Sequence, residues 1–571
     1  MATYNNLKPV EESKHIEDFR QMLRTNAEHF GDKTQYKYKE NGELVSVSYN
    51  EFYENVRSFS AALVKTGLAG KTVAVTGDTH PAWMVAFYSV VIMGGIIVPL
   101  DHELDPAQAA EFMKISKCSA VVYTSAMQPN IEKMLPKVDF LEKFIPVGAM
   151  LSGEKCMPFE EMIAIGRAAI DEGDTSFEDA EVDLDKVAAI LFTSGTTGSS
   201  KGVMLSQGNF VASANAACET TQYDTNDVFV SVLPIHHTYE LTTGQIAACN
   251  CGVTVCICEG VRYATRCFKE YQPTGLILVP LYLETIHKKI WSEIRRKGME
   301  KKVRAGMAIS DKMLMVGIDN REKLFGEITA VFGGRLKSVI VGGAPIDPEI
   351  VHDFYSFGIA VYQGYGITEC SPLVSVNRPG KIKFKTIGQS VPGCEVRIAP
   401  MADSENGEGE ILVRGANVMK GYYENEEATR AAFTDDGWFR TGDIGKMDKK
   451  GYITITGRLK NVIIASNGKN VFPEELEERL NRLTTVRECV VIGRDGENGE
   501  NGETVITAII VPDYDVLGEG TSDTAANLIL KEAIAQINRT LPAYKHINRF
   551  EIRHEDFEKT LTKKIKRFLV K

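Results

Sequence analysis

Apolar and polar positions follow two different patterns along the chain. Up to about residue 385, short β-branched runs alternate with stretches of helical periodicity. This alternation is typical of βα units that build a parallel sheet. The strands it predicts are 72–76, 120–123, 187–192, 337–341 and 358–362.

Beyond residue 385, the pattern favours antiparallel strands separated by turns. The runs 395–398, 409–414 and 451–456 alternate in polarity and are bounded by Gly and Asp. The last stretch, about 110 residues, predicts a smaller α+β unit. Within it, Pro473 is placed to begin a helix with Glu474 and Glu475 in its first turn. The segment 495–503 predicts a solvated hairpin or loop.

One uncharged apolar run, 83–100, approaches the length that spans a bilayer. Gly94 and Gly95 interrupt it, Pro99 lies near its end, and no Lys or Arg cluster flanks it. We therefore predict a buried helix followed by a buried strand, with a membrane span as the alternative.

Composition and charge narrow the class of protein. The 571 residues are 44% hydrophobic and 25% charged, as in globular proteins, and the length suggests two to four domains. A net charge of −11 disfavours nucleic acid as a partner. Eleven cysteines in a long chain and a polar N-terminus indicate a cytoplasmic protein with reduced thiols. Cys249, Cys251, Cys256 and Cys258 lack common zinc spacing and favour a buried strand.

A loop rich in Ser, Thr and Gly, FTSGTTGSSKG at 192–202, is the strongest chemical signal. It follows a predicted strand, and we expect a helix after it. Its backbone amides, hydroxyls and single lysine suit an oligophosphate. It is not a Walker A loop, because Ser200 precedes Lys201 and Gly202 follows it. A flexible linker is the alternative.

This loop resembles the signature loop of the adenylate-forming superfamily, which includes acyl-CoA synthetases, firefly luciferase and peptide-synthetase adenylation domains. Six further segments resemble its motifs, in matching order: LPIHHTYE (233–240), GGAP (342–345), QGYGITE (363–369), WFRTGDIG (438–445), GRLK (457–460) and KTLTKKIKR (559–567). The resemblance implies an α/β fold. It consists of a large N-terminal domain, 1–457, with two αβ-layered sheets and a small β-barrel, and a mobile α+β C-terminal domain, 458–571.

The resemblance also implies a reaction. A carboxylate attacks the α-phosphorus of ATP, pyrophosphate leaves, and the thiol of CoA then takes the acyl group. Glu369 would ligate Mg²⁺, Thr368 would touch the α-phosphate, and Tyr365 would offer a face to adenine. The other implied nucleotide and phosphate residues are Thr193, Ser194, Gly195, Thr196, Thr197, Gly198, Lys201, Gly343, Ala344, Gln363, Gly364, Gly366, Asp443 and Arg458.

Residues of the C-terminal domain would serve the two half-reactions in turn. Lys564 would stabilise charge during adenylation, with Lys563 and Lys566 as alternative registers. Lys460 would be the pivot of a domain rotation that brings Gly468 to the pantetheine tunnel. The basic tail, 559–571, leaves peripheral membrane contact open.

The segment LPIHHTYE (233–240), which resembles the family's fourth core motif, indicates which kind of carboxylic acid is the substrate. Peptide-synthetase domains place a carboxylate there for the substrate ammonium, whereas this chain has Ile235, His236 and His237, with Glu240 close by. This favours a medium- or long-chain fatty acid, with His236, His237 and Tyr239 bordering the acyl pocket. Adjacent residues of an extended segment point opposite ways, so the two histidines are a poor metal pair.

Three further expectations remain open at this stage. The acceptor is CoA or the phosphopantetheine of an acyl carrier protein. A nucleotide-binding protein without turnover is the alternative from a different class. A homodimer is an expectation at the level of the family.

Overall fold

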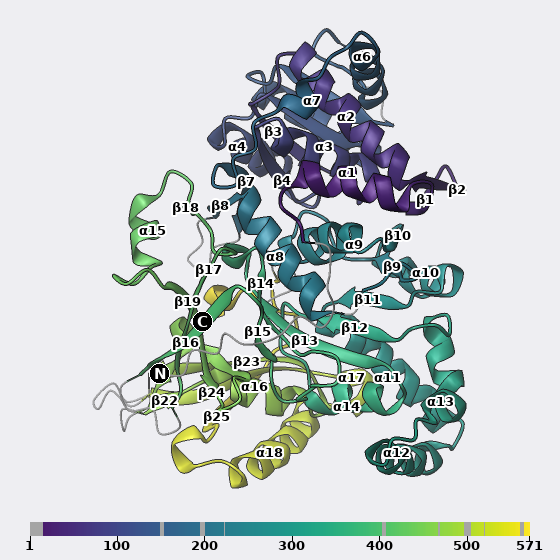
Figure 1. Cartoon of the computed structure of the whole chain (residues 1–571). Helices are drawn as coiled ribbons and strands as arrows, with labels where there is room; N and C mark the ends of the chain where they lie inside the picture. The colour runs from purple at the N-terminus through teal and green to yellow at the C-terminus, as the bar shows by residue number, and fades with distance from the viewer. Residues whose placement is uncertain are drawn as a thin grey trace.

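The computed structural model describes residues 15–148, 153–193, 200–221, 223–401, 407–465, 469–495, 504–518, 520–559 and 565–570. Figure 1 shows the N-terminal elements at one end of the molecule and the C-terminal strands at the other. Among the described residues, two large sheets and three small ones hold the strands.

A seven-stranded sheet has the order β18-β8-β7-β4-β3-β5-β6. Its parallel core confirms three predicted strands. The strands are β3 (Thr72–Thr76), β4 (Ile96–Leu100), β5 (Ala120–Thr124), β6 (Lys143–Val147), β7 (Val187–Thr193), β8 (Lys201–Ser206) and β18 (Gly421–Tyr422). The helices packed around it are α2 (Tyr49–Lys65), α3 (Pro81–Ile92), α4 (Pro106–Ile115) and α6 (Phe159–Asp171) (Figure 1).

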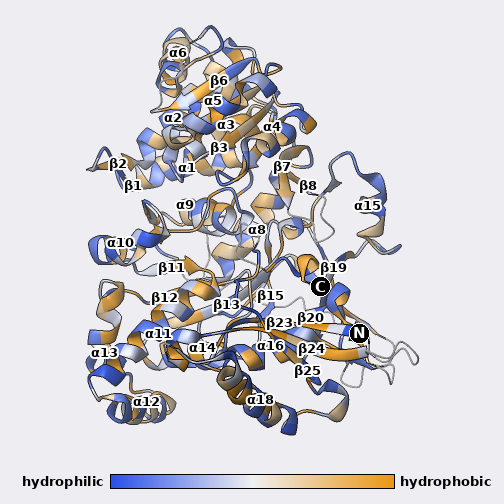
Figure 2. Ribbon diagram, turned by 180° about the vertical axis from the view of Figure 1, so that it is seen from behind, coloured by the Kyte–Doolittle hydropathy of each residue, from blue (hydrophilic) through white to orange (hydrophobic). Residues whose placement is uncertain are grey.

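The apolar run 83–100 is the buried helix and strand that the sequence predicts. Every residue of α3 is buried, and β4 follows it into the middle of the sheet. A helix that is apolar on all sides must be surrounded by protein or lipid, and here protein surrounds it. Figure 2 shows α3 and β6 as hydrophobic, while α15 (Glu426–Ala431), on the outside, is mainly hydrophilic. Within the described part of the chain, none of the helices has the length and apolarity needed to cross a bilayer.

A nine-stranded sheet has the order β15-β14-β13-β12-β11-β9-β10-β1-β2, parallel from β13 to β1. The strands are β1 (Thr34–Glu40), β2 (Glu43–Ser48), β9 (Val228–Ser231), β10 (Thr254–Ile257), β11 (Gly275–Leu278), β12 (Ser338–Val341), β13 (Ala360–Gly366), β14 (Leu373–Val376) and β15 (Gln389–Ser390). The helices α8 (Gln207–Thr220), α11 (Pro280–Arg296) and α14 (Pro348–Ser356) pack against it. Strand β10 confirms the buried strand expected at the cysteines, all of which are free thiols.

The antiparallel strands beyond residue 385 form an open sheet. They are β16 (Cys394–Pro400), β17 (Gly409–Gly415), β19 (Phe439–Met447) and β20 (Ile453–Arg458), in the order β16-β17-β19-β20. The strands are confirmed, whereas the described residues form no closed barrel. Closure needs hydrogen bonds between the first and last strands, and the two edge strands each pair with one neighbour.

The C-terminal segment has a hydrophobic core of its own. It contains a three-stranded sheet of β23 (Val486–Asp495), β24 (Thr504–Pro512) and β25 (Arg549–Ile552), together with the helices α16 (Pro473–Asn481) and α18 (Asp523–Arg539). Leu476, Val491 and Leu530 are fully buried in this core. The helix predicted at Pro473 is confirmed. Asp495 pairs with Thr504, which supports the predicted hairpin, whose tip lies outside the described residues.

The helix expected after the phosphate loop is α8 (Gln207–Thr220), but a strand that was not predicted, β8, lies between the loop and this helix. The loop joins β7 to β8, and these two strands pair in antiparallel register. Gly202, Val203, Leu205 and Ser206 are buried while Lys201 and Met204 are partly exposed, so the pairing with β7, and not a two-residue burial period, identifies this segment as a strand. Helix α8 begins only at Gln207, where Ser206 and Asn209 form a capping box.

Candidate functional site

A cleft of about 4220 Å³ contains every predicted site residue that the structure describes. Loops after β4, β9, β12 and β13, the β19–β20 hairpin and the C-terminal segment all contribute to its wall. The predicted residues that line it are Thr193, Lys201, His236, His237, Tyr239, Gly343, Ala344, Gln363, Gly364, Tyr365, Gly366, Thr368, Glu369, Asp443, Arg458 and Lys460. Segments spread over most of the sequence therefore meet in one place.

Several predicted residues lie outside the described residues: Ser194, Gly195, Thr196, Thr197, Gly198, Gly468, Lys563 and Lys564. Lys559 and Ile565 are the described residues on either side of the last two. Lys559 and Ile565 form a β-bridge, and both line the cleft. Lys566, the third register considered for the catalytic lysine, lines it as well and lies 3.7 Å from Glu558.

A buried carboxylate, Asp443, lies at the centre of the nucleotide side of the cleft. Only 3% of it is exposed. Its Oδ2 accepts a hydrogen bond of 2.6 Å from the Tyr365 hydroxyl, and its Oδ1 lies 2.8 Å from Arg458 Nε. Burial, and then the neighbouring Asp443 charge, raise the pKa of Tyr365 well above its usual value, so this hydroxyl remains a donor. The three side chains implied for adenine and ribose therefore form one network.

A second group links the phosphate loop to the predicted magnesium ligand. Glu369 belongs to a short 3-10 helix, Thr368–Cys370, and its Oε1 accepts a hydrogen bond of 3.0 Å from Tyr422. Lys201 Nζ lies 4.6 Å from the centroid of the Tyr422 ring. Tyr422 reaches this position because β18 pairs with β8. No motif marks Tyr422, which belongs to an isolated GY pair at 421–422.

Backbone forms the wall that the resemblance assigns to adenine. Gly343 and Ala344 are exposed in the cleft. A Cβ at Gly366 would lie 2.3 Å from the Pro372 carbonyl oxygen, so only glycine fits there. Gln363 is held from the opposite side, because its amide, oriented to donate, lies 3.0 Å from the Thr386 carbonyl.

The predicted pivot, Lys460, lies in a short 3-10 helix, Leu459–Asn461, at the end of β20. Burial, followed by the neighbouring Arg458 charge, lowers the pKa of Lys460 to about 8. An ion pair of 3.1 Å joins Arg482 of the C-terminal segment to Asp347, which caps α14. Contacts of this kind fix the C-terminal segment against the rest of the chain in the described arrangement.

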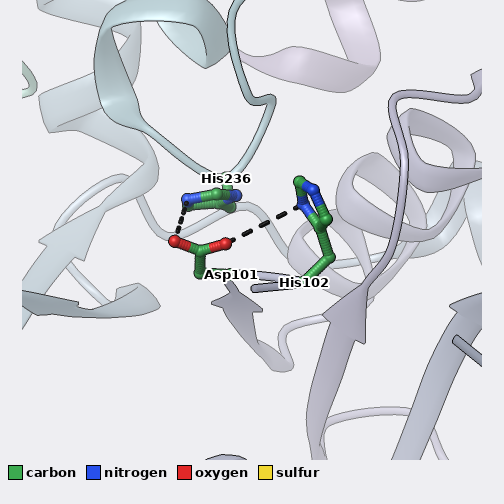
Figure 3. Close-up of side chains that lie close together, drawn as sticks. All are labelled: Asp101, His102 and His236. Carbon is green, nitrogen blue, oxygen red and sulfur yellow. Dashed lines mark ion pairs between the residues drawn. The ribbon is translucent and has the colours of Figure 1, made fainter. Parts of the chain in front are cut away.

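The acid side of the cleft holds a group that sequence reasoning missed (Figure 3). His236 Nε2 lies 3.3 Å from Asp101 Oδ2, and His102 Nδ1 lies 3.8 Å from Asp101 Oδ1. Burial raises the pKa of Asp101, but the contact with His236 outweighs it and lowers the value to about 2. The pair DH after the apolar strand 96–100 was the available signal, because polar residues at the carboxyl end of a parallel strand border the ligand crevice.

Tyr239 and Glu240, in the same segment as His236, form hydrogen bonds to other parts of the protein. Tyr239 donates a hydrogen bond of 3.1 Å to the Ile340 carbonyl. Glu240 accepts hydrogen bonds from Ser231 and Gln245, at 2.6 and 2.8 Å. Burial raises the pKa of Glu240 to about 7. These contacts tie the Glu240 carboxylate to protein groups, which leaves it poorly placed for a substrate ammonium.

Comparison with known proteins agrees with these features. A family model described as AMP-binding enzyme matches residues 23–423, and one described as AMP-binding enzyme C-terminal domain matches residues 460–570. The chain is 27% identical to the long-chain-fatty-acid–CoA ligase FadD15 of Mycobacterium bovis, over 93% of this chain and 91% of that protein. It is 26% identical to the long-chain-fatty-acid–CoA ligase 6 of Homo sapiens, over 86% of this chain and 74% of that protein.

Solved structures share the fold over almost the whole length. The anthranilate–CoA ligase AuaEII, in complex with anthranoyl-AMP, superposes with a TM-score of 0.76 at 19% identity, covering 97% of this chain and 96% of that one. MatB from Rhodopseudomonas palustris, bound to ATP, gives a TM-score of 0.72 at 23% identity, covering 96% and 98%. Since the first family model spans well over half of the residues, the chain belongs to the AMP-binding enzyme family, as its motifs imply.

Proposed function

We propose that the protein activates a fatty acid with ATP, releasing pyrophosphate and forming an acyl-adenylate, and then transfers the acyl group to CoA with release of AMP. The observation that carries this proposal is that the described site residues, from Thr193 to Lys460, line a single cleft. The names of the curated relatives support a long-chain fatty acid as the substrate.

ATP binding follows from the geometry around Asp443. Its buried carboxylate accepts hydrogen bonds from ribose hydroxyls, and Arg458 orients it at 2.8 Å. The Tyr365 ring, fixed through its hydroxyl, offers a face to the adenine base. The exposed backbone at Gly343 and Ala344 lets the base approach closely.

The phosphate side requires positive charge, because an anionic carboxylate must approach an anionic phosphate. Lys201 and the hydroxyls of its loop supply part of this charge and the hydrogen-bond donors. Glu369 would hold Mg²⁺, since this hard cation prefers oxygen ligands and the Tyr422 hydroxyl donates to Oε1 rather than Oε2. Bound Mg²⁺ would neutralise charge on the phosphates.

The acid side is apolar enough for an alkyl chain. Val232, Leu233, Ile235, Val279 and Ile340 line the cleft near His236 and Tyr239. Burying a methylene group there stabilises the complex by about 0.8 kcal/mol. Affinity should therefore increase with chain length until the pocket is filled.

We also propose that the chain divides at Gly457–Lys460 into domains 1–457 and 458–571, which rotate between the two half-reactions. The separate hydrophobic core of the C-terminal segment supports this division. Lys564 serves adenylation, and Gly468 faces the thiol arm after the rotation. Lys460, in the short 3-10 helix at the start of the C-terminal domain, is the pivot.

Pyrophosphate release from ATP, measured over a panel of carboxylic acids with and without CoA, tests the proposal. Fatty acids should drive release, and CoA should drive AMP formation. Thioester formation on a purified carrier protein but not on CoA would identify the other acceptor. ATP binding without turnover on any acid would leave a nucleotide-binding protein and contradict the proposal.

The basic tail carries less free charge than its composition indicates. Lys559 lies 2.6 Å from Glu488, and Arg567 forms an ion pair with Glu477. Phe568 and Leu569 remain about half exposed. These pairings weaken the case for a membrane-binding tail. Sedimentation with anionic vesicles tests it, and size-exclusion chromatography with light scattering tests the expected homodimer.

A further inference from the structure

We propose that Asp101, His102 and His236 form a binding site for a divalent transition-metal ion of the Zn²⁺ type. One potential ligand atom from each residue lies within 4.8 Å of the other two. Asp101 and His102 follow β4 of the seven-stranded sheet, while His236 lies in the loop after β9 of the nine-stranded sheet (Figure 3). Two sheets thus contribute to one cluster.

The spacing of the atoms suits a metal. Zinc bonds to nitrogen and oxygen are about 2.1 Å long, which places tetrahedral ligand atoms about 3.4 Å apart. The separations of 3.3 Å between His236 Nε2 and Asp101 Oδ2 and of 3.8 Å between His102 Nδ1 and Asp101 Oδ1 lie close to this value, and each nitrogen approaches a different oxygen of the carboxylate.

Two nitrogen atoms in the cluster need a partner. His236 Nε2 and His102 Nδ1 are both inaccessible to solvent, and neither has a hydrogen-bond partner among the described residues. His236 as a whole is 92% buried, since 8% of it is exposed. Both atoms face the oxygens of Asp101, but without the geometry of a hydrogen bond. Leaving such atoms unsatisfied is costly, and a cation between them and the carboxylate would satisfy all three groups.

The donor set selects the class of metal. Two imidazoles and one carboxylate suit Zn²⁺, Co²⁺, Ni²⁺ or Fe²⁺, whereas Mg²⁺ prefers oxygen ligands alone. This site is therefore chemically distinct from the one proposed at Glu369. All three residues line the cleft, so a fourth coordination position would open into it. The side chain of His102 is 33% exposed, which gives the ion a route of entry.

The test is a titration of the full, metal-free chain with Co²⁺, followed by its visible absorption, with Zn²⁺ as competitor. Wild-type protein should show one equivalent of low-symmetry Co²⁺ absorption that Zn²⁺ abolishes. His102→Ala and His236→Ala should each weaken binding about 100-fold or more, at least the effect of losing a group that supports a ligand. His287→Ala is the matched control, because His287 pairs with Asp353 at 2.8 Å without a second imidazole.

Three results would overturn the site. Wild-type protein could fail to bind Co²⁺, or His102→Ala could bind it as tightly as wild type does. A thiolate charge-transfer band would instead place the metal at cysteines such as Cys258 and Cys267, whose sulfur atoms lie 3.0 Å apart. Circular dichroism confirms folding of each variant. The partly exposed His102 keeps the test decisive if a change at the buried His236 prevents folding.

Discussion

Replacing Asp443 by asparagine should weaken ATP binding without unfolding the protein. The substitution keeps the size of the side chain but removes the negative charge that accepts the ribose hydroxyls. Arg458, the partner at 2.8 Å, has 39% of its side chain exposed, so water can solvate it in the variant. Asparagine keeps one acceptor oxygen for the Tyr365 hydroxyl, so the variant should stay folded while it loses the ion pair with Arg458 and the charged acceptor.

The magnitude follows from hydrogen bonds to a charged acceptor, which contribute about 1.5–3 kcal/mol. This corresponds to an increase of about 10- to 150-fold in the Kd for ATP. Tyr365→Phe is the control, because it removes the 2.6 Å hydrogen bond to Asp443 while keeping the aromatic face and the carboxylate. Its Kd for ATP should increase less than that of Asp443→Asn.

Titration calorimetry with ATP measures the Kd, and pyrophosphate exchange gives the KM for ATP and for the acid separately. The effect should fall on ATP, with the KM of the acid nearly unchanged. A folded Asp443→Asn protein that binds ATP within twofold of wild type would refute the ribose assignment. So would an equal loss for both substrates, which would indicate a general disturbance of the cleft.

Three further predictions concern turnover, pH and packing. Lys564→Ala should slow acyl-adenylate formation by about 10²–10³-fold yet leave the reaction of synthetic acyl-adenylate with CoA near normal. Lys460→Pro should do the reverse, because proline fixes φ. Separate assays of the two half-reactions measure these effects, and equal slowing of both half-reactions in Lys564→Ala would contradict the prediction. The folded-state pKa of Glu240, about 7, exceeds its ordinary 4.5, so unfolding free energy should fall as pH rises between these values. Glu240→Gln should avoid this loss of unfolding free energy, which amounts to about 3 kcal/mol. The variant should therefore melt at a higher temperature than wild type above pH 7 but not at pH 4.5. Equal Tm differences at both pH values would exclude the effect. Gly366→Ala should lower the Tm, whereas Gly364→Ala, whose added Cβ has its nearest neighbours at 3.5 Å, should not; a comparison of the two melting curves decides it.

Local patterns were sufficient for most of the fold. The strands 72–76, 120–123 and 187–192 were predictable because apolar runs with β-branched residues lack any helical period. Strand β8 was missed because the segment Lys201–Ser206 is short and contains a glycine. It becomes a strand by pairing with β7 and β18. Pairing between segments that are distant in sequence is set by tertiary structure, so no local window contains it.

The candidate site also has residues that the sequence could indicate and residues that only tertiary structure reveals. Residues inside motifs, such as Asp443 and Glu369, could be named because their segments resemble the motifs of a known family. The residues that contact such motif residues could not be named in the same way. Tyr422 contacts Glu369, and Asp101 contacts His236, only through the packing of other strands. The closed barrel was an expectation of the resemblance, and the four described strands make an open sheet instead.

The most direct test of the central claim is acid-dependent exchange of labelled pyrophosphate into ATP, followed by CoA-dependent release of AMP. We expect exchange with fatty acids of medium to long chain, no exchange with α-amino acids, and stoichiometric acyl-CoA and AMP once CoA is added. Exchange with amino acids, or hydrolysis of ATP that no carboxylic acid stimulates, would contradict the account.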